Sequence, residues 1–212
     1  MRAAPSHPSG IGMCRRPSAF TSRRTATWLL PLLLLGAPTV GADALRAQTG
    51  PSLVVLVRHA EKASPTDPDP SLSVAGKARA LALVDALANT TPSAIIVTSR
   101  KRTVETGEPL AIKLGLKEQV VALEGGTPAA HIAAVTAAVR KQKGVVLVVG
   151  HSNTVPAIIK ALGGPMLPDI CDASFATLYV LQPTRDRRPA QLVIGQYGAA
   201  DAAGATACAG MK

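Results

Sequence analysis

Runs of apolar residues alternate with amphipathic segments along the chain after residue 50. Three of these runs, at residues 53–57, 94–97 and 145–149, are continuously apolar, and such runs are typical of strands buried on both faces of a sheet. Strands of this kind belong to parallel sheets, in which helices join one strand to the next. The pattern therefore predicts an α/β fold: a three-layer α/β/α sandwich with a mostly parallel central sheet.

Helix signals lie between the predicted strands. The predicted helices cover about residues 73–89, 102–114 and 127–143. Ser73 is suited to be the N-cap of the first helix, and Gly115 is suited to end the second. A further helix is expected to start near Thr154, with Asn153 as its N-cap. Further along, residues 175–181 and 191–197 have strand character with no helix between them, so we expect an antiparallel pair at the edge of the sheet.

Each of the three buried runs ends in arginine or histidine. Arg58-His59 follows the first run, the basic cluster at residues 100–102 follows the second, and His151 follows the third. Because parallel strands place their carboxyl ends at one edge of the sheet, where α/β proteins bind ligands, these side chains are expected to meet there. The sequence thus predicts two histidines and two arginines in one small volume.

These segments resemble the motifs of the histidine phosphatase superfamily, which has the phosphoglycerate mutase-like fold. The resemblance runs from about residue 53 to the end of the last predicted strand and is carried, in the family's order, by Arg58-His59-Ala60-Glu61, by Leu72-Ser73 with Gly76 and Arg79-Ala80, by Arg102 with Thr106, and by Gly150-His151. It implies a hydrolase that releases phosphate from phosphomonoesters through a phosphohistidine on His59, without a metal or other cofactor.

The chemistry of phosphoryl transfer agrees with that assignment. His59 would attack phosphorus, which requires a neutral imidazole, and the charges of Arg58 and Arg102 should keep the pKa of His59 below its usual value of about 6.5. Each guanidinium can present paired donors to phosphate oxygens, a geometry that lysine lacks. The resemblance implies that His151 is a further catalytic and phosphate-binding group.

The choice of Arg102 within the basic cluster rests on the resemblance, because the family places its pocket arginine four residues before a threonine. Arg100 and Lys101 are interpreted as the solvated start of the helix. Lys62 follows the proposed nucleophile closely, and the sequence leaves open whether it contacts the substrate.

The proton donor for the leaving group is the least defined part of the predicted site. Glu124 follows a predicted third strand, where the resemblance places the acidic glutamate of the mutase branch, and it is the first candidate. Asp67 and Asp69 are alternatives, although their Asp-Pro repeats are typical of turns. Ser152 stands where the acid-phosphatase branch has an aspartate, so the sequence disfavours that branch.

The first 47 residues have the organisation of a secretory signal peptide. Basic residues up to Arg24 precede an apolar segment at residues 28–37, which is too short to span a bilayer, and small residues follow. Cleavage near residue 44 or 47 would leave one catalytic domain, residues 48–212, in the periplasm or outside the cell. An uncleaved membrane anchor is the alternative.

Composition limits the possible partners. Residues 1–47 carry six arginines and one aspartate, so the net charge of +10 becomes +5 once they are removed, which favours an anionic substrate. Only 2% of the residues are aromatic, so the chain lacks the stacking surfaces of single-strand nucleic-acid binders. We expect a monomer that acts on a small phosphorylated substrate or a phosphoprotein, with no nucleic acid and no membrane contact after cleavage.

Cysteine spacing gives no metal motif. After the predicted leader, only Cys171 and Cys208 remain, and in an oxidising compartment they could be either a disulfide or two free thiols. The arginines already supply the positive charge that a metal ion would otherwise bring to the phosphate.

Two alternatives to a phosphomonoesterase stay open. About 165 residues remain after the leader, which leaves little room for a lid, and phosphohistidine phosphatases of the same family are similarly compact and lack a strong acid. A module that binds phosphorylated ligands without turnover is the other alternative, suggested by the uncertain proton donor.

Overall fold

The computed structural model describes residues 50–123, 126–184 and 188–201. The chain divides into two units, Met1–Ala44 and Leu45–Lys212, and every described residue belongs to the second. The predicted leader, Glu124 and Cys208 lie outside the described residues.

A single six-stranded sheet forms the centre of the described chain. Its strand order is β3-β2-β4-β1-β5-β6, where β1 is Pro51–Arg58, β2 Ala94–Thr98, β3 Gln119–Val121, β4 Gly144–Gly150, β5 Thr177–Gln182 and β6 Gln191–Gln196. The first four strands run parallel, whereas β5 is antiparallel to β1 and to β6. The predicted parallel sheet with an antiparallel pair at its edge is therefore confirmed.

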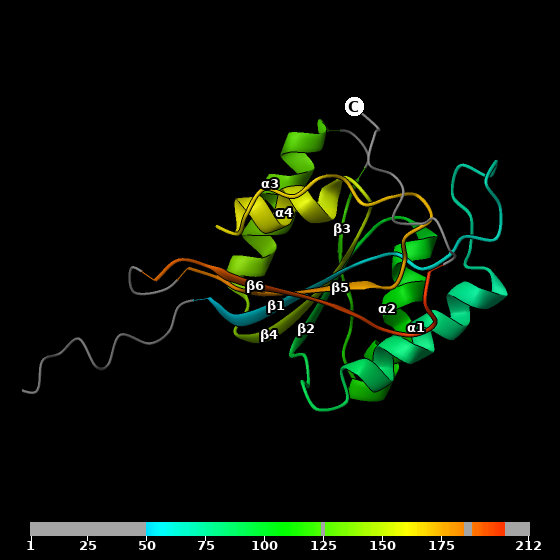
Figure 1. Cartoon of the computed structure of the whole chain (residues 1–212), viewed down its shortest axis with the longest axis horizontal. Helices are drawn as coiled ribbons and strands as arrows, with labels where there is room; N and C mark the ends of the chain where they lie inside the picture. The colour runs from blue at the N-terminus through cyan, green and yellow to red at the C-terminus, as the bar shows by residue number, and fades with distance from the viewer. Residues whose placement is uncertain (1–49, 124–125, 185–187, 202–212) are drawn as a thin grey trace, which may run out of the picture. The chain divides into compact units, whose positions relative to one another are not determined.

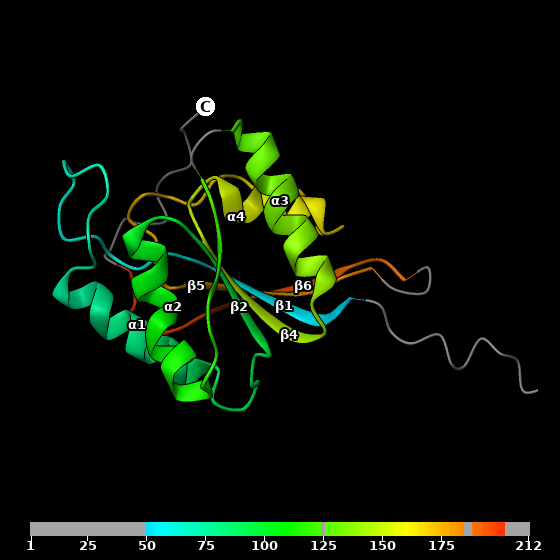
Figure 2. The ribbon, with the colours of Figure 1, turned by 180° about the vertical axis from the view of Figure 1, so that it is seen from behind.

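Two layers of helices enclose the sheet. The helices are α1 (Val74–Ala86), α2 (Lys101–Leu114), α3 (Pro128–Lys141) and α4 (Thr154–Ala161). α1 and α2 cover one face and α3 and α4 cover the other, as both views show (Figures 1 and 2). This arrangement confirms the predicted three-layer α/β/α sandwich. None of the helices in the described part of the chain is both long and apolar enough to cross a bilayer.

Burial on both faces explains the continuous apolar run of β1. Val54 and Leu56 pack in the cluster formed with α3 and α4, whereas Val55 and Val57 pack in the cluster formed with α1 and α2. All four side chains are at most 1% exposed. A polar residue at any of these positions would lose its solvation, so the strand stays apolar until Arg58 at its carboxyl end.

Local sequence signals define the helix starts, with one correction. The side chains of Ser73 and Thr127 accept hydrogen bonds from the backbone of α1 and α3, as expected of N-caps. Asn153 occupies the N-cap position of α4, but its backbone is helical and its side chain makes no capping bond. The capping role that Asn153 would favour is thus wrong; instead, the hydroxyl of Thr154 accepts a hydrogen bond from the backbone N–H of His151 at 2.9 Å.

Candidate functional site

The register of β1 and β4 brings the two histidines together. Arg58 pairs with Gly150 across these parallel strands, and the backbone N–H of His59 donates to the carbonyl of Gly150 at 2.9 Å. The two strands therefore end level with each other. As a result the ring centroids of His59 and His151 are 5.4 Å apart.

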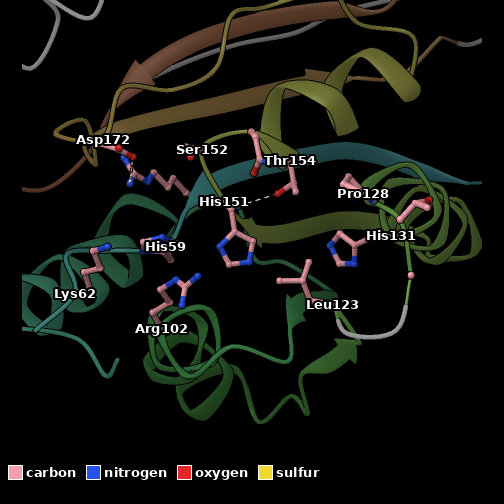
Figure 3. A pocket seen from close by; sticks show the side chains of 14 residues that line it. His59, Lys62, Arg102, Leu123, Pro128, His131, His151, Ser152, Thr154 and Asp172 are labelled. Carbon is pink, nitrogen blue, oxygen red and sulfur yellow. Dashed lines mark hydrogen bonds and ion pairs between the residues drawn. The ribbon is translucent and has the colours of Figure 1, made fainter. Parts of the chain in front are cut away.

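A pocket of about 420 Å³ lies at these strand ends (Figure 3). Its lining includes all four histidines and arginines that the sequence placed there, together with residues from the starts of α3 and α4. Lys62 also lines the pocket, so its side chain is placed to meet a ligand. The basic residues of the lining are Arg58, His59, Lys62, Arg102, His131 and His151.

The ring of His59 is held with one nitrogen available for nucleophilic attack. Nδ1 lies 2.8 Å from the carbonyl oxygen of Ala60, and because a carbonyl only accepts, Nδ1 carries the hydrogen and Nε2 the lone pair. The pKa of His59 is lowered to about 4, mainly by burial and to a smaller extent by the charges of Arg58 and Arg102, against the opposing effect of the bond to Ala60. His59 is therefore a neutral imidazole at pH 7.

The spacing of Arg102 and Thr106 has a structural reason. One helical turn separates them, and the hydroxyl of Thr106 donates to the carbonyl of Arg102 at 2.6 Å while accepting from the backbone N–H of Ala60 at 3.0 Å. Thr106 thus ties the first turn of α2 to the loop that carries His59. The side chain of Arg102 is 17% exposed and extends into the pocket.

The guanidinium of Arg58 is clamped by the loop before β5. Nη1 donates to the carbonyls of Cys171 at 2.6 Å and Ser174 at 3.2 Å, and Nη2 donates to Asp172 at 3.3 Å. The group also stacks 4.4 Å from the ring centroid of Phe175. Nε is buried with no hydrogen-bond partner among the described residues, so Nε–H and the second N–H of Nη2 are the donors left for an anion.

The loop that clamps Arg58 is covalently anchored. Cys171 takes part in a disulfide bond, and the chain's other two cysteines, Cys14 and Cys208, lie outside the described residues. The pairing of Cys171 with Cys208 therefore stays a prediction.

His151 is oriented through both its backbone and its ring. Nε2 lies 3.1 Å from the hydroxyl of Thr98, the last residue of β2, which leaves Nδ1 as the ring nitrogen for a ligand. Burial lowers the pKa of His151 to about 3, with smaller contributions from His59 and Arg102. The ring is thus neutral at pH 7, and a bound phosphate would favour its protonation.

Two residues of the first motif region support the site from outside the pocket. Arg79 is buried and donates from Nε and Nη2 to the carboxylate of Glu61, and from Nη1 to the carbonyls of Tyr197 at 3.1 Å and Ala199 at 2.9 Å. The loop after His59 is thereby joined to α1 and to the segment after β6. Gly76 permits this packing, because a Cβ there would collide with the backbone oxygen of Glu61.

The candidate acids are dispersed. Glu124 lies outside the described residues. Asp67 is exposed and accepts from the backbone N–H of Asp69 at 2.9 Å, which is turn chemistry, whereas Asp69 lies 3.7 Å from Nη1 of Arg102. Asp172 lines the pocket, but its side chain is 82% exposed and ion-paired to Arg58. Sequence reasoning did not identify Asp172, which stands in a loop with no motif.

No group of three or more His, Cys, Asp or Glu side chains in the described ranges is arranged to hold a metal ion. The cationic side chains of the pocket lining include the guanidinium groups of Arg58 and Arg102 and the ammonium group of Lys62.

We expect the shifted pKa values to be visible in a histidine titration. The ring resonances of His59 and His151 should titrate near pH 4 and pH 3 in ¹H–¹³C correlation spectra, with His59→Asn and His151→Asn used for assignment. Because the unfolded chain binds these protons below about pH 6.5 and the folded chain does not, the free energy of unfolding should fall as the pH is lowered from about 6.5 toward 4. A midpoint above pH 6 for His59 would contradict the burial argument.

Comparison with known proteins agrees with this geometry. The family model "histidine phosphatase superfamily (branch 1)" matches residues 54–125, a range that contains Arg58, His59 and Arg102. Comparison with curated proteins gave no match.

Solved structures share the fold. A mycobacterial glucosyl-3-phosphoglycerate phosphatase is similar with a TM-score of 0.52 and 16% identity, over 70% of this chain and 99% of that one. The protein histidine phosphatase SixA, solved in complex with tungstate, is similar with a TM-score of 0.52 and 17% identity, over 68% of this chain and 96% of that one. At these identities the likeness establishes a common fold.

Proposed function

We propose that the chain is a phosphatase-type hydrolase of the histidine phosphatase superfamily, whose family model matches residues 54–125, and that it hydrolyses phosphomonoesters through a phosphohistidine on His59. The observation that carries this proposal is the His59 ring, neutral and with Nε2 unprotonated, in a pocket shared with Arg58 and Arg102. A nucleophile of low pKa beside two fixed cations suits attack on a phosphate dianion.

Substrate binding uses the cationic side chains. Arg58 offers Nε–H and one N–H of Nη2 from a clamped position, and Arg102 offers its guanidinium from the first turn of α2. His151 contributes Nδ1, which donates once the phosphate has favoured its protonation. Together these groups surround the phosphoryl oxygens and stabilise the charge of the transition state.

The reaction takes two displacements. Nε2 of His59 attacks phosphorus, the bond from phosphorus to the leaving oxygen breaks, and that oxygen takes the electron pair and a proton. Water then attacks the phosphohistidine and gives a proton back to the group that protonated the leaving oxygen. The P–N bond breaks, Nε2 regains its lone pair and inorganic phosphate leaves. The bond from Nδ1 to Ala60 holds the ring in one orientation through both steps.

Glu124 remains our proposed proton donor for the leaving oxygen. The residues on both sides of the 124–125 segment, Leu123 and Gly126, line the pocket, which supports this choice. The exposed carboxylate of Asp172 is less suited, because it is paired with Arg58 and its desolvation is slight.

The proposal includes metal independence and export. Two guanidiniums and Lys62 provide positive charge of the kind that a metal ion supplies in other phosphatases. The basic, apolar and small-residue order of residues 1–47 supports a cleaved secretory signal, with a single catalytic domain as the mature, monomeric protein.

A phosphohistidine phosphatase is the second candidate. The pocket carboxylate in the described lining, Asp172, is 82% exposed, and an imidazole leaving group needs less protonation than an alkoxide. The predicted mature chain of about 165 residues leaves little room for a lid, which would also suit a phosphoprotein substrate.

The phosphoenzyme tests the proposed function directly. After mixing the mature protein with a reactive phosphodonor and quenching without acid, intact-mass spectrometry should show one added phosphoryl group. The adduct should be absent from His59→Asn. If neither an adduct nor phosphate release is seen, the binding-module alternative is favoured; turnover without an adduct would require rapid quenching to reveal the intermediate.

A further inference from the structure

His131 lines the pocket, and the proposed phosphate chemistry does not use its ring nitrogens. The residue lies in the first turns of α3 and is 5% exposed. Nδ1 lies 3.0 Å from the carbonyl oxygen of Ala122, so it carries the hydrogen and ties α3 to the end of β3. Nε2 is buried and has no hydrogen-bond partner among the described residues. In the neutral ring this nitrogen is an acceptor, and a buried acceptor without a donor is unfavourable.

The position of His131 relates it to the leaving group. Figure 3 shows its ring on the far side of His151 from His59, with Leu123 and Pro128 nearby. In-line attack by His59 directs the leaving group away from that nucleophile, across the phosphoryl group. The part of the pocket around His131 is therefore the part that a leaving group would enter.

The chemistry of the unpartnered nitrogen selects among leaving groups. An alkyl or aryl ester would leave Nε2 without a donor, whereas a hydroxyl group on the leaving group would satisfy it. A site that hydrogen-bonds a substrate hydroxyl discriminates strongly against the analogue that lacks it, because the buried polar group is then left unpaired.

We propose that Nε2 of His131 accepts a hydrogen bond from a hydroxyl of the leaving group, so that the substrates are phosphomonoesters of polyols, sugars or hydroxy acids. This inference rests on the proposed function, which places the phosphoryl group at His59. It deepens that function by naming the substrate class. His131 is a specificity-determining residue in this scheme and takes no part in the covalent steps.

The test compares two ligands of the same branching, glycerol 2-phosphate and isopropyl phosphate, which differ in their hydroxyl groups. Binding is measured by calorimetry on the full chain carrying His59→Asn, so that turnover does not consume the ligand. We expect the preference for glycerol 2-phosphate to fall by about three- to tenfold when His131→Asn is added, which is the contribution of one hydrogen bond. Asparagine keeps an amide N–H for Ala122 and removes only the acceptor in the pocket.

A second variant separates this role from a structural one. His131→Gln places an amide near the position of Nε2 and should recover part of the preference, whereas a purely structural histidine would give no such recovery. An unchanged ligand preference in His131→Asn, or binding of neither ligand, would overturn the inference.

The proposed function is measured separately, as hydrolysis of para-nitrophenyl phosphate by the chain with His59 intact. A changed ligand preference in His131→Asn without any hydrolysis by the unsubstituted chain would contradict the proposed function and support the hydroxyl subsite. Hydrolysis with an unchanged ligand preference would support the proposed function and contradict the hydroxyl subsite.

Discussion

Replacement of His59 with asparagine is expected to lower kcat for phosphomonoester hydrolysis by about 10³-fold or more. The asparagine amide can keep the hydrogen bond from the Nδ1 position to the carbonyl of Ala60, so the change removes the nucleophilic Nε2 and little else. Phosphate affinity should stay within about threefold of the unsubstituted chain, because Arg58 and Arg102 are untouched. Loss of turnover with retained binding is therefore the expected signature.

Initial rates with para-nitrophenyl phosphate and calorimetric titration with inorganic phosphate measure the two quantities. The thermal unfolding midpoint of His59→Asn confirms that the variant is folded. Substantial turnover by this variant would remove His59 as the nucleophile. If the unsubstituted chain binds phosphate and hydrolyses no phosphodonor, the protein is a binding module.

The layers of the fold could be predicted because strands buried on both faces are apolar at every position. The residues of β1 pack alternately against α1 and α2 on one side and against α3 and α4 on the other, so the strand reads as one apolar run. The helix starts at Ser73 and Thr127 were likewise predictable, because capping is local chemistry. The start of α4 at Thr154 was predictable as well, but the expected capping bond from Asn153 is not made, since the backbone of Asn153 is itself helical.

The meeting of the four basic residues was predictable for a topological reason. Arg58, Arg102 and His151 follow three parallel strands whose carboxyl ends share an edge, and the level ends of β1 and β4 then place His59 beside His151. The pattern could not reveal what holds Arg58, because its partners, such as Ser174, lie more than 100 residues away in a loop without periodicity.

His131 escaped prediction for a related reason. It lies within an amphipathic helix, where a histidine has no motif, and its relation to the pocket depends on how α3 packs beside β3.

The sequence predicted that the pKa of His59 is lowered, but it did not predict the main cause. Neighbouring arginines were expected to keep the ring neutral, and they do lower its pKa, yet burial has the larger effect. Burial is a property of the folded chain: the ring is 5% exposed because the loop after β1 is covered by α2 and by His151. Its magnitude could not be derived from spacing alone.

Arg102→Ala is expected to lower kcat/KM by about 10²- to 10³-fold, as removal of one preorganised charged donor does in other enzymes. Lys101→Ala is the matched control, because it removes the same charge from the same helix start while the Lys101 side chain is exposed and outside the pocket lining. A difference in kcat/KM between the two variants separates the effect of the Arg102 hydrogen-bond donors from the general effect of removing a positive charge. Lys101→Ala should change kcat/KM by no more than about twofold.

Arg102→Lys refines the comparison, since it keeps the charge and removes the paired N–H geometry. If charge alone binds the phosphoryl group, Arg102→Lys should recover nearly all of the activity, and if paired donors are required it should recover only part. The measurement is kcat/KM over a range of salt concentrations, because screening weakens a point charge more than a short hydrogen bond at a partly buried site. Equal losses in Arg102→Ala and Lys101→Ala would place Arg102 outside the site, and the clamped Arg58 would then be the guanidinium that holds the phosphate.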